Sequence, residues 1–377
     1  MIAPADRTKQ ISEYYFSKKL REISSLQKEG KPIINLGIGS PDLSPDDQVI
    51  QTLKQGADDP NAHGYQSYQG LPALRDAIKS FYQRKYHKDI STLEVLPLMG
   101  SKEGITHVSL AYLNPGDEVL IPELGYPTYT SVTKMVGAKP VHYPLVDTSW
   151  EPDWDELSKL DTSRVKLMWL NYPHMPTGVK ASVAQLERFV AFAKERSILI
   201  CYDNPYSFLG NDQPLSIFNV EGALEIALEL SSVSKTFNMA GWRLGWVAGN
   251  EQLVQPVLQI MSNMSSGMFR PIQEAAIAAL QLGDEWYGKL NEVYTKRRNI
   301  GQRIFDLLGC AYDPNQAGMF IWAKSSSSGE ELSDKLLNDY DVFIAPGFIF
   351  GEKGYGYVRM SLCAPESKLE EVLNRIK

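Results

Sequence analysis

The stretch SSVSKTFNMAGWRLG, residues 231–245, places one lysine, Lys235, between hydroxyl side chains and an arginine, Arg243. Near a fixed cation and away from bulk water the pKa of a lysine falls, and the neutral amine can form a Schiff base with a carbonyl. Ser232, Ser234 and Arg243 suit a phosphate dianion, because hydroxyls donate hydrogen bonds and a guanidinium holds two oxygens. The window therefore favours a ligand with a carbonyl and a phosphate, although a solvated loop lysine fits it equally well.

An acidic residue follows a predicted buried strand upstream of this window. Pyridoxal 5'-phosphate (PLP) is a carbonyl compound that carries a phosphate, and its enzymes need a carboxylate against the pyridine nitrogen. The apolar run SILICYD, residues 197–203, predicts a parallel strand that ends at Asp203, and such sheets bind ligands beyond the carboxyl ends of their strands. Tyr206 could donate its hydroxyl to the phenolic oxygen of the ring. An ordinary Asp-Asn-Pro turn is the alternative interpretation.

A third segment, VLPLMGSKEGI at residues 95–105, predicts a strand, a tight turn and the start of a helix. Gly100 lets the backbone approach a ligand closely, and the free N–H groups at a helix start bind phosphate. Ser101 adds a hydroxyl, although a Gly-Ser pair before a helix is also a common cap. The segment supports the phosphate site because the other two segments predict the same phosphate-containing ligand.

These segments, in this order, resemble a fold-type I PLP-dependent aminotransferase of the class I/II superfamily that contains aspartate aminotransferase. The resemblance covers nearly the whole chain. Its further pieces are NLGIGSPD at 35–42, YQSYQGLPALR at 65–75, GYPTY at 125–129, MPTG at 175–178, APGFIFG at 345–351 and YVRMS at 357–361.

The resemblance implies a role for each matching position. Lys235 would hold PLP as a Schiff base and would move the proton between the substrate Cα and the cofactor. Asp203 would pair with the pyridinium nitrogen, Tyr206 would bond the phenolic oxygen, and Tyr126 would stack on the ring.

Other positions would bind the phosphate and the substrate. Arg359 would clamp the substrate α-carboxylate, and the Gly39 N–H would assist it. Tyr65 would reach the phosphate of the neighbouring subunit, which implies a homodimer with shared active sites. Packed aromatic roles for Tyr65 and Tyr126, and an exposed edge arginine on the predicted strand 357–362, are the alternatives. The implied phosphate ligands are Ser101, the Lys102 amide, Ser232, Arg243 and, as a helper, Ser234.

Met175 departs from the family pattern, which has asparagine at this position. The family asparagine bonds the phenolic oxygen and helps to hold the substrate carboxylate, whereas methionine offers only a weak sulfur acceptor. Losing such a bond to a charged group costs about 1.5–3 kcal/mol. We still expect PLP to bind and transamination to survive, but a carbon–sulfur or related lyase at the same cofactor stays open.

The pattern of apolar runs predicts an α/β fold. Short runs at 118–122, 165–170, 198–203, 227–233 and 244–248 alternate with helical patterns, which indicates an open, mostly parallel sheet flanked by helices. The resemblance implies seven strands and three parts. Residues 1–45 would pack with a small α/β domain at 276–377, and residues 46–275 would form the large PLP-binding domain.

Composition agrees with this interpretation. The net charge is −7, which argues against nucleic acid and anionic membrane partners. The three cysteines, Cys201, Cys310 and Cys363, are widely spaced and fit neither a metal site nor a disulfide framework. No signal peptide or membrane span is apparent in the sequence, and we expect a cytoplasmic protein.

The predicted activity is transfer of an amino group from an amino acid to a 2-oxo acid by ping-pong kinetics. The resemblance implies 2-oxoglutarate and glutamate as one substrate pair. The donor is open among aspartate, alanine and LL-diaminopimelate. Lys102 could bind a distal carboxylate, or its side chain could lie in solvent. The rival classes are the PLP lyase and a non-catalytic PLP-binding regulator. From its length and charge we expect no basic DNA-binding domain in this sequence, which counts against the regulator.

Overall fold

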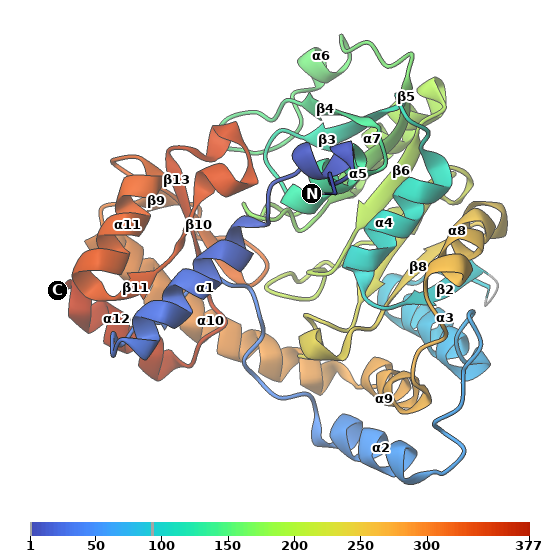
Figure 1. The fold of residues 1–377 in the computed structure, drawn as a ribbon, viewed down its shortest axis with the longest axis horizontal. Helices are drawn as coiled ribbons and strands as arrows, with labels where there is room; N and C mark the ends of the chain where they lie inside the picture. Colours follow the sequence, from blue (N-terminus) through green and yellow to red (C-terminus); the bar gives the residue numbers. More distant parts are fainter. Residues whose placement is uncertain (1, 92–93) are drawn as a thin grey trace.

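The computed structural model describes residues 2–91 and 94–377 of the chain. Met1, which begins the expected N-terminal segment, lies outside the described residues, as do Thr92 and Leu93. Figure 1 shows a large sheet with helices on both sides and a smaller group of strands and helices built from the two ends of the chain. The expected α/β class is confirmed.

The large sheet has seven strands in the order β2-β8-β7-β6-β5-β3-β4. Only β8 runs antiparallel to its neighbours, and the remaining pairs are parallel. The inner strands are buried along nearly their whole length, as expected where both faces carry helices. The strands are β2 (Val95–Leu98), β3 (Glu118–Pro122), β4 (Lys139–Tyr143), β5 (Val165–Asn171), β6 (Leu199–Asp203), β7 (Ala227–Ser232) and β8 (Gly245–Gly249).

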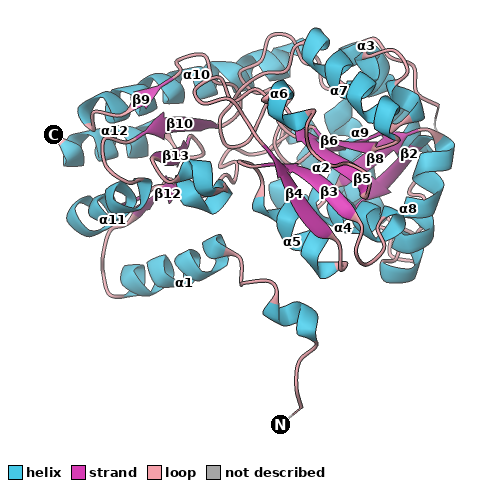
Figure 2. Cartoon of the chain, turned by 90° about the horizontal axis from the view of Figure 1, so that it is seen from above, coloured by secondary structure: helices cyan, strands magenta, loops and turns pink. Residues whose placement is uncertain are grey.

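Helices cover both faces of this sheet (Figure 2). One face packs against apolar side chains of α4 (Ser101–Tyr112), α5 (Pro127–Met135) and α8 (Glu251–Met264). The other face packs against α3 (Pro72–Tyr86), α7 (Val183–Arg196) and α9 (Arg270–Leu280). Helix α2 (Asp47–Asp58) lies along α9, and the single turn α6 (Trp154–Leu157) precedes β5.

The smaller group of elements combines the N-terminal and C-terminal segments. Its antiparallel sheet has the order β12-β13-β10-β9, and a separate parallel pair joins β1 to β11. The β1–β11 pair ties the N-terminal segment to the C-terminal one. The elements are α1 (Tyr15–Lys28), β1 (Ile34–Asn35), α10 (Asp284–Leu307), β9 (Ala311–Tyr312), β10 (Phe320–Lys324), α11 (Gly329–Tyr340), β11 (Val342–Phe343), β12 (Ala345–Pro346), β13 (Tyr357–Ser361) and α12 (Glu366–Ile376).

The fold brings the candidate residues to one edge of the large sheet. Asn171, Asp203 and Ser232 are the last residues of the adjacent parallel strands β5, β6 and β7. Asn171 and Asp203 are register partners, so their side chains lie next to each other. This is the carboxyl edge at which open α/β sheets bind ligands.

Candidate active site

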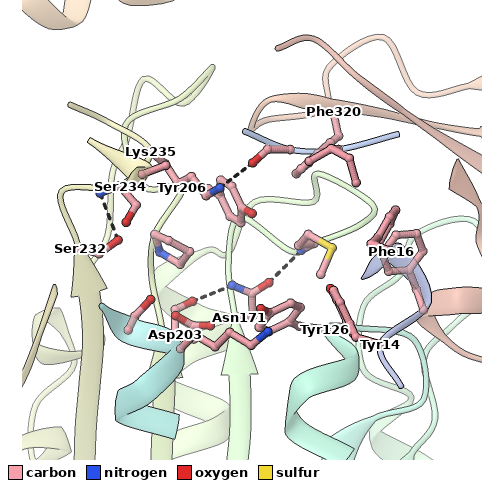
Figure 3. A pocket seen from close by; sticks show the side chains of 18 of the residues that line it. Tyr14, Phe16, Tyr126, Asn171, Asp203, Tyr206, Ser232, Ser234, Lys235 and Phe320 are labelled. Atoms are coloured by element: carbon pink, nitrogen blue, oxygen red, sulfur yellow. Dashed lines mark hydrogen bonds between the residues drawn. The ribbon is translucent and has the colours of Figure 1, made fainter. Parts of the chain in front are cut away.

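A cavity of about 580 Å³ opens at this carboxyl edge. Its walls come from the large sheet, from the smaller group of elements and from the start of α1. Figure 3 shows Lys235, Ser232 and Ser234 on one side of it, and Tyr14 and Phe16 on the opposite side. The lining includes nearly every residue expected from the sequence: Gly39, Ser101, Lys102, Tyr126, Asp203, Tyr206, Ser232, Ser234, Lys235, Arg243 and Arg359.

Lys235 lies in the turn that follows β7, and its amine reaches into the cavity. Its Nζ donates a hydrogen bond of 2.6 Å to the carbonyl oxygen of Gly39. Burial lowers the pKa of Lys235, and the nearby cations Arg359 and Arg243 lower it further. These are the conditions under which a lysine becomes a nucleophile. Here Gly39 presents its carbonyl to the lysine, whereas the expected role of Gly39 used its N–H.

Asp203 is a buried carboxyl group with one oxygen left free. Its Oδ2 accepts a hydrogen bond of 2.7 Å from the hydroxyl of Tyr129, and Oδ1 is buried without a partner. Burial raises the pKa of Asp203 to about 6, against the lowering effect of the Tyr129 bond. A buried oxygen of this kind calls for a donor, preferably a cationic one.

Asn171 holds the main chain around Asp203. Its Nδ2 donates to the Asp203 carbonyl at 2.6 Å, and its Oδ1 accepts from the backbone N–H of Met175 at 2.8 Å. The loop that carries Met175 is therefore tied to the strand end that carries Asp203.

The turn between β2 and α4 leaves space that side chains would fill. Gly100 has φ +90°, and a Cβ there would lie 2.3 Å from the Arg243 guanidinium. A Cβ on Gly245 would lie 2.7 Å from the backbone N of Ser101. The two glycines therefore let Arg243 and the start of α4 come together. The first N–H groups of a helix have no partners within it, so this corner suits an anion.

Two serines complete that corner. Ser232 and Ser234 are both buried, and the Ser232 hydroxyl accepts a bond of 3.3 Å from the Ser234 backbone N–H. Ser101 is the first residue of α4, while the cap position belongs to Gly100 and makes no side-chain cap bond. Ser101 therefore does not act as the helix cap, which was the alternative from the sequence.

Tyr126 and Tyr206 both line the cavity. The ring of Tyr126 meets the ring of Tyr129 edge to face at 5.5 Å, and Tyr206 meets Phe320 in the same way at 5.9 Å. Burial raises the pKa of both hydroxyls, so both remain protonated donors at neutral pH.

Arg359 is a buried cation on the inner strand β13. Its Nη2 donates to the Gly37 carbonyl at 2.8 Å, its Nη1 contacts the Met175 sulfur at 3.3 Å, and its Nε is buried without a partner. Burial lowers the pKa of Arg359 to about 10, so it stays charged at neutral pH. No salt bridge to Arg359 exists within residues 2–91 and 94–377. The alternative of an exposed edge arginine is wrong.

Tyr65 is the expected residue that this chain does not bring to the cavity. Its side chain is 95% exposed and lies outside the lining. Other residues also line the cavity, and no role was predicted for them from the sequence. These are Tyr14, Phe16, Tyr129, Asn171, Phe320 and Phe350.

The cavity fits PLP on observations of the chain itself. The free Oδ1 of Asp203 matches a pyridinium N–H, and the corner of Ser101, Ser232 and Arg243 matches a phosphate. The Lys235 amine lines the same cavity and can take the carbonyl.

A family model described as "Aminotransferase class I and II" matches residues 31–376. The chain belongs to this family. The activity expected from the sequence is thereby confirmed as that of an aminotransferase. Members of the family use PLP and are typically homodimers that act on amino acids.

Curated relatives of this aminotransferase match it from end to end. It is 36% identical to the LL-diaminopimelate aminotransferase of Halothermothrix orenii, over 99% of this chain and 97% of the relative. It is 37% identical to the enzyme of the same name from Gloeobacter violaceus, again over 99% and 97%.

Solved structures share the fold. BacF from Bacillus subtilis superposes with a TM-score of 0.95 at 34% identity, covering 100% of this aminotransferase and 98% of BacF. An aminotransferase from Staphylococcus aureus gives a TM-score of 0.90 at 29% identity, with coverage of 99% and 98%. Across the part of the chain that the structure describes, no helix is long and apolar enough to cross a membrane.

Proposed function

We propose that this aminotransferase binds PLP in the cavity, with Lys235 as the covalent attachment point and Asp203 as the counter-ion of the pyridine nitrogen. The observation that carries the proposal is that the Lys235 amine and the unpartnered Oδ1 of Asp203 belong to one cavity. Tyr206 donates to the phenolic oxygen and Tyr126 stacks on the ring. The phosphate is bound by Ser101, the Lys102 amide, Ser232 and Arg243, with Ser234 as a helper.

The chain's own residues then orient the substrate and move a proton. Bound PLP supplies the carbonyl that accepts the amino group and the ring that withdraws electrons. Arg359 holds the substrate α-carboxylate, which satisfies its free Nε, and the Gly39 N–H assists. Lys235 takes the proton from the substrate Cα and returns it on the cofactor side. Its depressed pKa keeps the amine available for that step.

The reaction follows ping-pong kinetics, with glutamate and 2-oxoglutarate as one pair. The donors considered are aspartate, alanine and LL-diaminopimelate, the last being the substrate in the names of the relatives. The test is a half-reaction. PLP-loaded protein is mixed with single amino acids and no oxo acid, and cofactor and ammonia are measured. Pyridoxamine 5'-phosphate, reversed by 2-oxoglutarate, supports transamination. Ammonia with PLP retained would favour the alternative, a carbon–sulfur lyase.

We further propose a homodimer in which Tyr65 binds the phosphate in the partner's site. Its near-complete exposure in the single chain supports this role. Tyr65→Ala should weaken PLP binding by about 10- to 100-fold, because a hydrogen bond to a charged group is lost. A mixture of Tyr65→Ala and Lys235→Ala chains should then recover activity, since mixed dimers hold one intact site. With random pairing roughly a quarter of the sites would be intact.

Absence of complementation in verified mixed dimers would place Tyr65 in its own chain's site or outside any site. Tyr355→Ala is the matched control, since Tyr355 is also exposed and does not line the cavity. It should bind PLP as the wild type does.

Met175→Asn should change substrate affinity more than PLP occupancy. The Met175 sulfur now contacts Nη1 of Arg359, and an amide there could bond the α-carboxylate directly. We expect substrate to bind about tenfold more tightly. Half-reactions at varied amino acid concentration, with PLP occupancy from absorbance, measure both quantities. Met175→Leu keeps the apolar volume and should resemble the wild type. If Met175→Asn also bound substrate and PLP as the wild type does, position 175 would have no part in specificity.

A further inference from the structure

The end of the cavity opposite the phosphate corner is lined mainly by aromatic and aliphatic side chains, with Ser17 as a polar residue of α1. Figure 3 places Tyr14 and Phe16 across the cavity from Ser232 and Ser234. Tyr14 precedes α1, Phe16 lies in its first turn, and Leu20 follows one turn later on the same helix face. The start of α1 therefore forms the wall that faces a substrate side chain once the amino group is held near Lys235.

Aromatic rings also surround the cation that holds the substrate carboxylate. The guanidinium carbon of Arg359 lies 3.9 Å from the ring centre of Phe320, 4.6 Å from that of Phe350 and 5.5 Å from that of Phe16. The place where a substrate carboxylate would meet Arg359 is therefore bordered by aromatic rings. Met175 extends the apolar surface where the family has an amide.

The charges that one chain places around the cavity leave little for a second charged group of the substrate. Asp203 is the one carboxyl group among the described lining residues, and the cofactor nitrogen uses it. Three of the four lining cations, Lys235, Arg243 and Arg359, have roles in the proposed function. The fourth, Lys102, is exposed and holds its Nζ 4.7 Å from the ring centre of Tyr14.

We infer that the amino donor carries an uncharged apolar side chain, aromatic or branched aliphatic, and that Tyr14, Phe16 and Leu20 select it. The inference rests on the proposed function, whose site it deepens. An apolar donor side chain packs against this wall and leaves the Lys102 ammonium over the Tyr14 ring. The distal carboxylate of 2-oxoglutarate, by contrast, draws the Lys102 ammonium into the cavity. A donor with a second ammonium, such as LL-diaminopimelate, finds no free carboxylate among the described lining residues.

The first experiment compares donors in half-reactions of the PLP-loaded full chain. We expect the second-order rate constant of the half-reaction to be at least about tenfold higher for L-phenylalanine and L-leucine than for L-aspartate and LL-diaminopimelate. Faster reaction of either charged donor would overturn the inference while leaving transamination intact. If no amino acid reacted, L-alanine included, the proposed function would fail first. Calorimetry with two unreactive acids gives a second readout: 3-phenylpropionate should bind more tightly than glutarate.

The second experiment tests the wall itself. Leu20 is 42% exposed, so Leu20→Glu should fold, and it places a carboxylate at the apolar end. The preference for phenylalanine over alanine should fall by about tenfold, because alanine is too short to reach the wall. Leu307→Glu is the matched control, since Leu307 is 51% exposed on α10 and does not line the cavity. An unchanged preference in Leu20→Glu, with tight 3-phenylpropionate binding retained, would show that α1 does not select the donor.

Discussion

Lys235→Ala should abolish covalent PLP attachment and reduce turnover by at least about 10³-fold. Lys235 is the buried amine at the carboxyl edge of β7, and its pKa is lowered by burial and by two neighbouring arginines. Alanine removes both the nucleophile and the group that carries the Cα proton. The remaining contacts could still hold PLP without a covalent bond. Borohydride reduction followed by mass spectrometry measures attachment, and steady-state kinetics measures turnover.

Lys102→Ala is the control for this experiment, because Lys102 lines the same cavity. It should keep the covalent label and the rate of the half-reaction with an apolar donor, since its proposed phosphate contact uses the backbone N–H. The assignment of Lys235 would be contradicted if mass spectrometry found the borohydride-reduced cofactor attached to Lys102, or attached to any residue of Lys235→Ala.

The large sheet follows from the sequence because its inner strands are buried on both faces. The predicted runs at 118–122 and 198–203 match β3 and β6 to within a residue. The strand β4 was not predicted, because it lies at the sheet edge and only its last residue, Tyr143, is fully buried. Continuous apolar runs identify the central strands and the buried edge strand β2, whereas the edge strand β4 lacks such a run.

A smaller share of the site residues than of the sheet strands could be predicted from the sequence. Lys235, Asp203 and Ser101 sit at recognisable strand and helix ends, so the resemblance located them in one cavity. Tyr129 was missed because its contact with Asp203 joins residues 74 apart in the chain, although both lie at the carboxyl edge. Asn171 carried a usable signal, since it ends the strand before β6 as Asp203 ends β6 itself.

The walls of the cavity depend on contacts that no local pattern encodes. Arg359 touches Gly37 across 322 positions of sequence and Met175 across 184. Phe16 reaches Arg359 from the other end of the chain. The position of α1 is set by packing between the two chain ends, so its part in the site emerges only from the tertiary structure.

Asp203→Asn should have opposite effects on the enzyme with and without PLP. In the loaded enzyme an amide cannot keep the pyridine nitrogen protonated, and kcat should fall by about 10²–10³-fold. In the apoprotein the carboxyl pKa is about 6 against 3.8 for an ordinary aspartate. Between these values the folded state binds a proton that the unfolded state has lost, so stability falls as the pH rises through this window.

The size of the apoprotein effect follows from that shift. About two pKa units correspond to a deficit of about 3 kcal/mol above pH 6. Asparagine removes the charge, still accepts from Tyr129 and leaves the two N–H groups of its amide unpaired, at a cost of about 1–2 kcal/mol. The Asp203→Asn apoprotein should therefore be about 1–2 kcal/mol more stable than the wild type at pH 8, and no more stable at pH 4.

Urea unfolding of both apoproteins at the two pH values measures this difference. Asp212→Asn provides the control, because Asp212 is exposed, and its stability should match the wild type at both values. A loaded Asp203→Asn enzyme with normal kcat would remove Asp203 from catalysis. Equal apoprotein stabilities at pH 8 would instead show that water or a bound cation already satisfies Oδ1. An aspartate that only stabilised the fold would instead make the apoprotein less stable when its charge is removed, so a variant with lower kcat and a more stable apoprotein identifies a catalytic carboxylate.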